Sequence, residues 1–358
     1  MDPTRLILVG GFLGAGKTNL LMSAAELLKK RGIPVGLVTN DQAEGLVDTA
    51  YLEENGNTVA EVSGSCFCCN FPGFLDAVKS VANRIGGGVT LAEPVGSCTD
   101  LSMTILQPLK DKYADVAHTA PLTVLGDPKR LRRNIRDRKI GGNYISSCQF
   151  DEADIILISK IDLLSESELD QLIRDTGDAW PDAKVMAVST KENRGVAEWL
   201  NAVLNETEAG RNKAEVDYDI YAAGEASYGW LNADFTFGDA PFDYQQAAES
   251  LLGILAETFD GKNLEVGHVK FLLDSGRREW IGNLTGTKET AMLRKTEHET
   301  EGRKLIVNAR VETGPFELQN IVLKAVAEAF ADAEITGTQI RTLIPGRPDP
   351  TYRYERIV

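Results

Sequence analysis

Residues 1 to about 205 alternate short apolar runs, rich in β-branched side chains, with longer amphipathic stretches. The short runs predict buried strands, and the stretches with apolar residues every three or four positions predict helices. Because strands and helices alternate, we expect an α/β fold with a mostly parallel sheet covered by helices. The predicted strands are Thr4–Val9, Val35–Asn40, Thr58–Val62, Val89–Ala92, Leu122–Leu125, Ile155–Ser159 and Lys184–Ser189. The predicted helices are Lys17–Lys30, Pro72–Arg84, Leu101–Tyr113, Glu166–Thr176 and Val196–Asn205.

The pattern changes after residue 205, and 358 residues exceed what one hydrophobic core usually absorbs. Residues 206–230 begin polar and end rich in aromatic side chains, so we expect an ordered linker between domains 1–205 and 231–358. The second domain reads as strand, helix (Asp243–Phe259), three or four strands, helix (Phe316–Ala331) and a last strand near Gln339–Leu343. This order predicts a smaller α+β domain on an antiparallel sheet.

A phosphate-binding loop follows the first predicted strand. The segment GFLGAGKT, residues 11–18, fits the pattern GxxxxGK[ST] and lies between a strand and a helix, as that loop requires. Its glycines let backbone N–H groups point at phosphates, Lys17 reaches the β- and γ-phosphates, and the Thr18 hydroxyl ligates Mg²⁺. The predicted nucleotide-binding residues here are Gly11, Gly14, Ala15, Gly16, Lys17, Thr18 and Asn19.

Two later loops are typical of guanine recognition. Ser159-Lys160-Ile161-Asp162 follows a predicted strand and is similar to the signature NKxD, with Ser159 in place of the usual Asn. A carboxylate such as that of Asp162 accepts two hydrogen bonds from guanine that adenine cannot donate. Ser189 and Thr190, after the next strand, resemble the second loop that contacts guanine. We therefore expect GTP and GDP as ligands.

Three of the five cysteines crowd into Cys66-Phe67-Cys68-Cys69, directly after a predicted strand. Three thiolates so close together form much of a soft-metal site suited to Zn²⁺, Cu(I) or Co²⁺. Cys98 follows another strand of the same sheet, and we consider it as a fourth ligand. The alternatives are redox-active vicinal thiols and buried cysteines with a packing role.

Charge and hydropathy exclude several classes of partner. With 53 acidic against 38 basic residues the net charge is −15, which repels phosphate backbones and argues against nucleic acid as the main partner. No apolar run approaches the ~20 residues that span a bilayer. The apolar stretch at the N-terminus is too short for a signal peptide. We therefore expect a cytoplasmic protein that has no membrane partner.

Together, GGFLGAGKT, the cysteine cluster, Glu93-Pro-Val-Gly96 and SKID resemble the CobW-type GTPases, which are metallochaperone relatives of the urease and hydrogenase maturation GTPases. The resemblance covers residues 1 to about 205. The C-terminal part is similar to the family's accessory domain only in its element order. Residues 93–96 match the family's Glu-x-x-Gly switch, although Pro94 and Val95 depart from it.

The resemblance implies a function and roles for particular residues. Glu93 would position the attacking water, Gly96 would contact the γ-phosphate, and Asp41, where the family has Glu, would help Thr18 hold Mg²⁺. Cys66, Cys68 and Cys69 match the family's CxCC metal motif. The implied function is Mg²⁺-dependent GTP hydrolysis, with Lys17 and Glu93 as catalytic residues, coupled to delivery of Zn²⁺, Co²⁺ or a corrinoid.

Partners and other functions stay open at this stage. The expected partners are an unidentified client metalloprotein or corrinoid protein and, in one nucleotide state, a second copy of the chain. An ATP-driven activator of a redox or corrinoid enzyme would differ in its base preference. A non-catalytic metal-buffering protein would bind Zn²⁺ without turnover, and a small-molecule kinase would need neither CxCC nor SKID.

Overall fold

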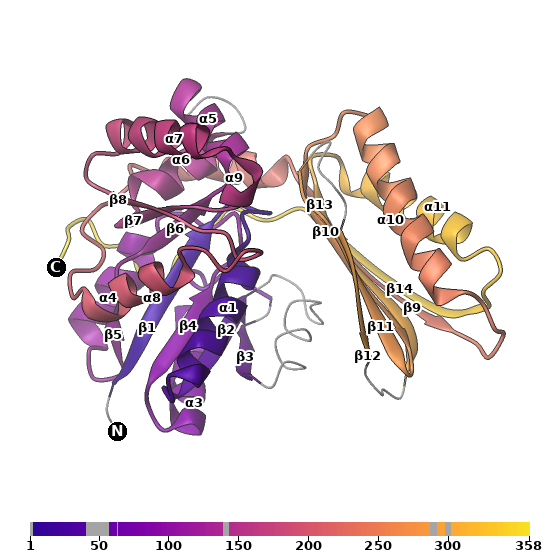
Figure 1. Cartoon of the computed structure of the whole chain (residues 1–358), viewed down its shortest axis with the longest axis horizontal. Helices are drawn as coiled ribbons and strands as arrows, with labels where there is room; N and C mark the ends of the chain where they lie inside the picture. The colour runs from indigo at the N-terminus through magenta and orange to yellow at the C-terminus, as the bar shows by residue number, and fades with distance from the viewer. Residues whose placement is uncertain (1–2, 41–56, 63, 139–142, 287–291, 298–301) are drawn as a thin grey trace. The chain divides into compact units, whose positions relative to one another are not determined.

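A computed structural model describes residues 3–40, 57–62, 64–138, 143–286, 292–297 and 302–358. The chain divides into two compact units (Figure 1). Unit 1 comprises Met1–Tyr221 together with Arg347–Val358, and unit 2 comprises Ala222–Gly346. The sequence pattern predicts that the first domain ends at residue 205 and the second begins at 231. In the structure the boundary along the chain falls after Tyr221, and residues 347–358 belong to unit 1.

Unit 1 contains a parallel sheet, as the alternation of strands and helices predicts. Its order is β3-β2-β4-β1-β6-β7-β8, and β5 pairs beside the beginning of β1. The neighbours β3, β2, β4 and β1 carry the cysteine loop, Asn40, Glu93 and the phosphate loop at their carboxyl ends. The strands are β1 (Thr4–Gly11), β2 (Val35–Asn40), β3 (Thr58–Val62), β4 (Val89–Glu93), β5 (Ala117–Thr119), β6 (Thr123–Gly126), β7 (Ile155–Ile158) and β8 (Lys184–Ala187).

Helices flank this sheet (Figure 1). Helix α1 has the predicted bounds, but the segment predicted as one helix over Leu101–Tyr113 is a π-helical turn, Ser102–Leu106, that continues into α4. The helices are α1 (Lys17–Lys30), α3 (Phe71–Ile85), α4 (Gln107–Lys112), α5 (Pro128–Arg136), α6 (Tyr144–Asp151), α7 (Glu166–Ala179), α8 (Val196–Asn205) and α9 (Tyr218–Ala226).

Unit 2 is an antiparallel sheet with two helices, which confirms the predicted α+β class. The sheet order is β12-β11-β10-β13-β9-β14, and α10 and α11 pack together on one face (Figure 1). Alternate strand residues such as Leu305, Val307 and Ala309 form the core with both helices. The elements are β9 (Gly229–Phe237), α10 (Tyr244–Gly261), β10 (Val266–Ser275), β11 (Arg278–Leu284), β12 (Met292–Glu297), β13 (Arg303–Val311), α11 (Pro315–Ala329) and β14 (Ile335–Leu343).

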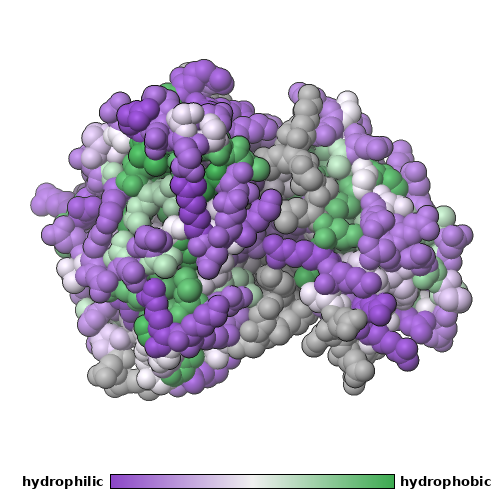
Figure 2. Space-filling view, in the orientation of Figure 1, coloured by the Kyte–Doolittle hydropathy of each residue, from purple (hydrophilic) through white to green (hydrophobic). Residues whose placement is uncertain are grey.

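Hydrophilic side chains cover most of the face shown in Figure 2, with apolar patches between them on both units. Across the described ranges, no helix combines the length and the apolar composition that crossing a membrane requires. Apolar side chains are instead concentrated in the cores on either side of the parallel sheet and beneath α10 and α11.

Candidate nucleotide and metal site

The loop between β1 and α1 has the backbone of a phosphate-binding turn. Gly11, Gly14 and Gly16 have φ angles of 130°, 78° and 98°, in the region that glycine alone adopts readily. A Cβ on Gly11 would lie 2.6 Å from the carbonyl oxygen of Leu125, so a larger residue does not fit. Helix α1 begins at Lys17 without an acidic residue in its first turn, which leaves its positive dipole end for a phosphate.

Lys17 and Thr18, the two side chains of α1 that the sequence predicts to bind phosphate and Mg²⁺, face the end of β4. The Lys17 ammonium donates to the Gly11 carbonyl at 2.9 Å and lies 3.8 Å from Oε1 of Glu93. The Thr18 hydroxyl donates to the same Glu93 oxygen at 3.3 Å. A hydroxyl and a carboxylate meeting at one point are the hard oxygen donors that Mg²⁺ prefers, so these residues fit the ion. Asp41, the other predicted Mg²⁺ ligand, lies outside the described residues.

The two loops predicted to read the base lie together. Lys160 has a φ of 54°, which turns the chain sharply after β7. The Ser189 hydroxyl donates to Oδ1 of Asp162 at 2.7 Å, and the Lys191 ammonium lies 3.9 Å from Oδ2. The buried Ser159 hydroxyl finds no hydrogen-bond partner among the described residues, which leaves it available to a ligand. The contacts from Ser189 and Lys191 mean that the second loop orients the Asp162 carboxylate.

The remaining residues predicted to bind the nucleotide lie in or next to the phosphate loop and the second base-reading loop. Ala15 is buried within the phosphate loop, where its N–H donates to the Phe12 carbonyl at 3.1 Å. Asn19 is half-buried on the first turn of α1. Thr190 is half-buried in the turn that follows Ser189.

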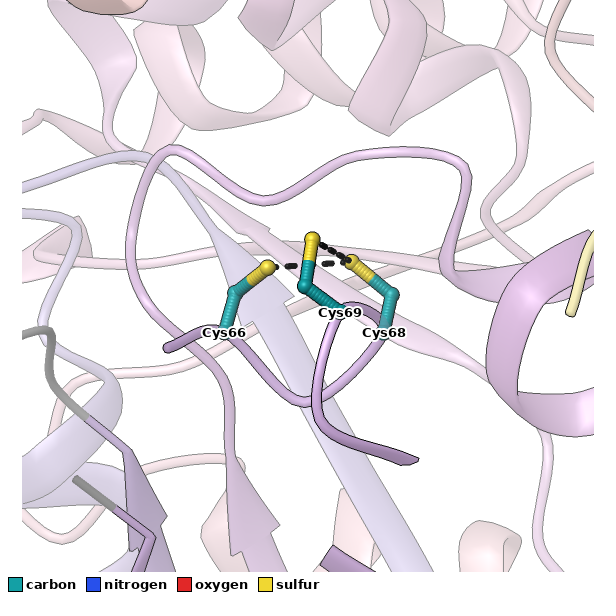
Figure 3. Close-up of side chains that lie close together, drawn as sticks. All are labelled: Cys66, Cys68 and Cys69. Carbon is teal, nitrogen blue, oxygen red and sulfur yellow. Dashed lines mark hydrogen bonds between the residues drawn. The ribbon is translucent and has the colours of Figure 1, made fainter. Parts of the chain in front are cut away.

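The three thiols of the CxCC motif converge (Figure 3). The sulfurs of Cys66 and Cys68 are 3.2 Å apart, those of Cys68 and Cys69 are 3.9 Å apart, and all three lie within 4.8 Å of one another. Four thiolates at the usual Zn–S length of about 2.3 Å are roughly 3.8 Å apart in a tetrahedron, so these spacings suit one ion. Cys66 and Cys68 are buried although they lie in a loop.

Asn40, the last residue of β2, shapes the loop that carries these thiols. Its side-chain amide donates to the carbonyls of Val62 and Ser65 at 2.8 and 2.7 Å, and its Oδ1 accepts from the N–H of Phe67 at 2.9 Å. Three bonds from one side chain therefore fix the backbone before and inside the CxCC motif. Asn40 also immediately precedes Asp41, the predicted Mg²⁺ ligand that lies outside the described residues.

Cys98 lies on the loop after β4 and also reaches the cluster, since its thiol hydrogen-bonds with those of Cys66 and Cys68. The loop is held from α6, where the Gln149 amide donates to the carbonyls of Gly96 and Cys98 at 3.0 and 2.7 Å. The structure thus brings the sulfurs of Cys66, Cys68 and Cys69 within 4.8 Å of one another and places Cys98 beside this group.

The thiols share protons unequally. Hydrogen bonds from Cys68, Cys69 and Cys98 hold the pKa of Cys66 well below its usual range, because they stabilise its thiolate. The hydrogen bond to Cys66 raises the pKa of Cys69 to about 11, and the same partner raises that of Cys68. Metal binding would displace the remaining thiol protons, because a cysteine ligates a metal as its thiolate.

Sequence reasoning missed the C-terminal segment. The N–H of Thr351 donates to the Cys68 carbonyl at 2.8 Å, and the Arg353 guanidinium pairs with Asp100 at 2.8 Å. No local pattern marks these residues, because they come from the far end of the chain and belong to a stretch without regular secondary structure.

The parallel sheet, phosphate loop and base-reading loop define unit 1 as a P-loop domain of the GTPase class. The chain belongs to the CobW/HypB/UreG family, since residues 5–187 match the model of the CobW/HypB/UreG nucleotide-binding domain. That family consists of P-loop GTPases.

Two curated relatives carry names that refer to zinc. The zinc chaperone YjiA of Escherichia coli is 26% identical over 171 residues, which cover 47% of this chain and 52% of that protein. The zinc-regulated GTPase metalloprotein activator 1 of Schizosaccharomyces pombe is 27% identical over 187 residues, 49% of this chain and 43% of that protein. The chain thus spans about half the length of these relatives.

Similar solved structures include Zn(II)-bound YjiA GTPase from E. coli, with 16% identity, a TM-score of 0.38 and coverage of 92% of this chain and 99% of that one. HypB from Helicobacter pylori in complex with nickel has 18% identity, a TM-score of 0.43 and coverage of 60% and 91%.

Proposed function

We propose that the protein is a Mg²⁺-dependent GTPase that couples GTP binding and hydrolysis to the binding and delivery of a transition metal, zinc or cobalt, or of a corrinoid, to a client protein. The observation that carries this proposal is the placement of the thiols and the switch residues. They follow four adjacent strands, β3, β2, β4 and β1, at the same edge of the sheet. Ligands in such sheets bind at this edge.

In the nucleotide half, Lys17 and the loop N–H groups would compensate the phosphate charge. The Glu93 carboxylate, which lies 3.3 Å from the Thr18 hydroxyl, would orient the attacking water. Bound Mg²⁺, held by Thr18, would supply further neutralisation of the phosphates. GTPases without an arginine from a partner turn over at about 10⁻⁴ to 10⁻² s⁻¹, and we expect this range.

In the metal half, Cys66, Cys68 and Cys69 would bind a soft cation, and Cys98 would be the fourth ligand. The donor set is all sulfur and the spacings suit a tetrahedron, which favours Zn²⁺ or Co²⁺ over harder ions. The Cys98 loop also contains Gly96, so a contact between Gly96 and the γ-phosphate would move a thiol together with the switch. This connection is what makes metal binding dependent on the nucleotide.

The test is a pair of metal titrations. Zn²⁺ and Co²⁺ are titrated against a chromophoric competitor in the presence of Mg·GDP and of a non-hydrolysable Mg·GTP analogue. Linkage requires that nucleotide and metal change each other's affinity by the same factor, typically 5- to 150-fold, or about 1–3 kcal/mol. Equal metal affinities in both nucleotide states would contradict the proposal.

Cysteine variants identify the ligands. Cys66→Ser, Cys68→Ser and Cys69→Ser should each weaken Zn²⁺ binding. Cys148→Ser is the matched control, because Cys148 is a buried cysteine in α6 outside the cluster. The proposed ligand set is wrong if all four variants bind Zn²⁺ alike.

A further inference from the structure

The last residues of the chain, 347–358, form a segment that we call the C-terminal strap. It contacts the CxCC loop through three hydrogen bonds. The N–H of Thr351 donates to the Cys68 carbonyl at 2.8 Å, and its hydroxyl donates to the Cys69 carbonyl at 3.2 Å. The N–H of Asp349 donates to the Cys69 sulfur. The strap therefore holds the backbone of two predicted ligands and also contacts one sulfur.

The strap also binds the loop of the fourth thiol. The Arg353 guanidinium donates to Oδ2 of Asp100 at 2.8 Å, and this carboxylate is almost fully buried two residues after Cys98. Tyr218 donates to the same oxygen at 2.8 Å, and Arg353 lies over its ring. Asp100 has a φ of 65°, so the backbone turns sharply where the strap grips it.

Further contacts keep the strap in place beyond these two loops. The N–H of Tyr354 donates to the Met103 carbonyl at 3.1 Å, and the Tyr352 and Tyr113 hydroxyls are 3.1 Å apart. At the end of the chain, the N–H of Val358 donates to the Gln107 side chain at 2.9 Å. The strap is thus docked along its length, and Arg353 is not an isolated surface contact.

We propose that the C-terminal strap positions the metal-binding thiols, with Thr351 holding the CxCC loop and Arg353 holding the Cys98 loop through Asp100. The two residues are two positions apart in the strap, and their contacts bridge loops that follow different strands. Thr351 and Arg353 leave the sulfurs themselves available for a metal, since they bind carbonyls and a carboxylate. Both are therefore positioning residues, and their role rests on the proposed metal binding.

The experiment compares Arg353→Ala and Arg353→Lys with Arg356→Ala, which removes an exposed arginine of the same strap. Zn²⁺ affinity is measured with a chromophoric competitor, and the Co²⁺ form is examined by absorption spectroscopy. Loss of an outer-shell partner typically weakens metal binding 10- to 100-fold. We expect such a loss in Arg353→Ala, with altered Co²⁺ ligand-field bands, partial recovery in Arg353→Lys and no change in Arg356→Ala.

A second readout needs no metal. With the strap loosened, the cysteines of the metal-free protein should react faster with a maleimide in Arg353→Ala and in Thr351→Ala, and GDP affinity and thermal unfolding report whether the fold persists. If the wild-type protein binds neither Zn²⁺ nor Co²⁺, the proposed function fails, while faster labelling still supports the strap. Wild-type labelling rates in both variants, or wild-type Zn²⁺ affinity in Arg353→Ala, would overturn the inference.

Discussion

Gly96 lies at the point where the switch loop meets the phosphate loop, and Gly96→Ala tests that contact. A Cβ added here would lie 2.7 Å from Cδ2 and 3.0 Å from the backbone nitrogen of Leu13. The Leu13 side chain can rotate, but its backbone lies between the conformationally restricted Gly11 and Gly14. On its other side the switch loop is tied to α6, because Gln149 donates to the Gly96 carbonyl. The switch loop therefore cannot move away without breaking the hydrogen bond from Gln149, and the phosphate loop cannot move away without changing the backbone around Leu13.

Overpacking of this kind costs about 1–3 kcal/mol. We infer that Gly96 contacts the γ-phosphate, so the added methyl group should oppose the closed, triphosphate-bound loop most. At 1.4 kcal/mol per tenfold change, affinity for a non-hydrolysable GTP analogue should fall roughly 5- to 150-fold. Affinity for GDP should fall less, because GDP does not require the switch to close.

Calorimetry of both nucleotides, together with phosphate release from GTP, measures this effect. Gly177→Ala is the matched control, because Gly177 lies in α7 and a Cβ there meets nothing within 4 Å. That variant should bind nucleotide normally and gain up to about 1 kcal/mol of stability from its higher helix propensity. If folded Gly96→Ala binds the GTP analogue and hydrolyses GTP like the wild type, the switch has been misplaced.

Three further predictions concern the other parts of the site. Calorimetry should show GDP binding at least tenfold more tightly than ADP, and Asp162→Asn should erase that preference; equal affinities in the wild type would refute guanine specificity. Lys17→Ala should abolish phosphate release while leaving the fold intact, since its ammonium compensates phosphate charge and is not a core group, and normal turnover would refute its role. Cys98→Ser should weaken the sulfur-to-metal charge-transfer band of the Co²⁺ form, whereas an unchanged spectrum would remove Cys98 from the ligand set.

The parallel sheet could be predicted from sequence because its strands are short apolar runs. The helices between them differ in having apolar residues only every three or four positions. Helix α1 has the predicted bounds, since Gly16 and Gly32 border an unbroken amphipathic pattern. Helix α5 was overlooked because it is only 9 residues long and rich in arginine, so few apolar residues mark its buried face. Its capping residue Asp127, followed by Pro128, is a start signal that could have revealed it.

The site was predictable where each motif is local and not where it depends on contacts distant in sequence. The phosphate loop and the CxCC motif each occupy a few consecutive residues, whereas Asn40 reaches Ser65 and Arg353 reaches Asp100 across long stretches of chain. The helix expected from residue 101 begins as a π-helical turn, because its start is fixed by Glu152, which accepts from the N–H of Ser102 at 2.8 Å. Such tertiary constraints leave no periodic signal.

Three of the connections to the thiol loops could carry movement to them, and apart from the Asp349 N–H they act on backbone or on neighbouring side chains. Asn40 joins the CxCC loop to the end of β2, and Gly96 joins the Cys98 loop to the phosphate loop. The C-terminal strap, which follows unit 2 at Gly346, joins the two thiol loops to each other. None of these connections replaces a sulfur ligand, so movement along any of them would change the spacing of the thiolates and leave the donor set intact. Because donor type largely determines which metal a site prefers, nucleotide should change the affinities for Zn²⁺ and Co²⁺ by similar factors. A nucleotide state that reversed the preference between these metals would require a ligand to enter or leave, which these contacts do not provide.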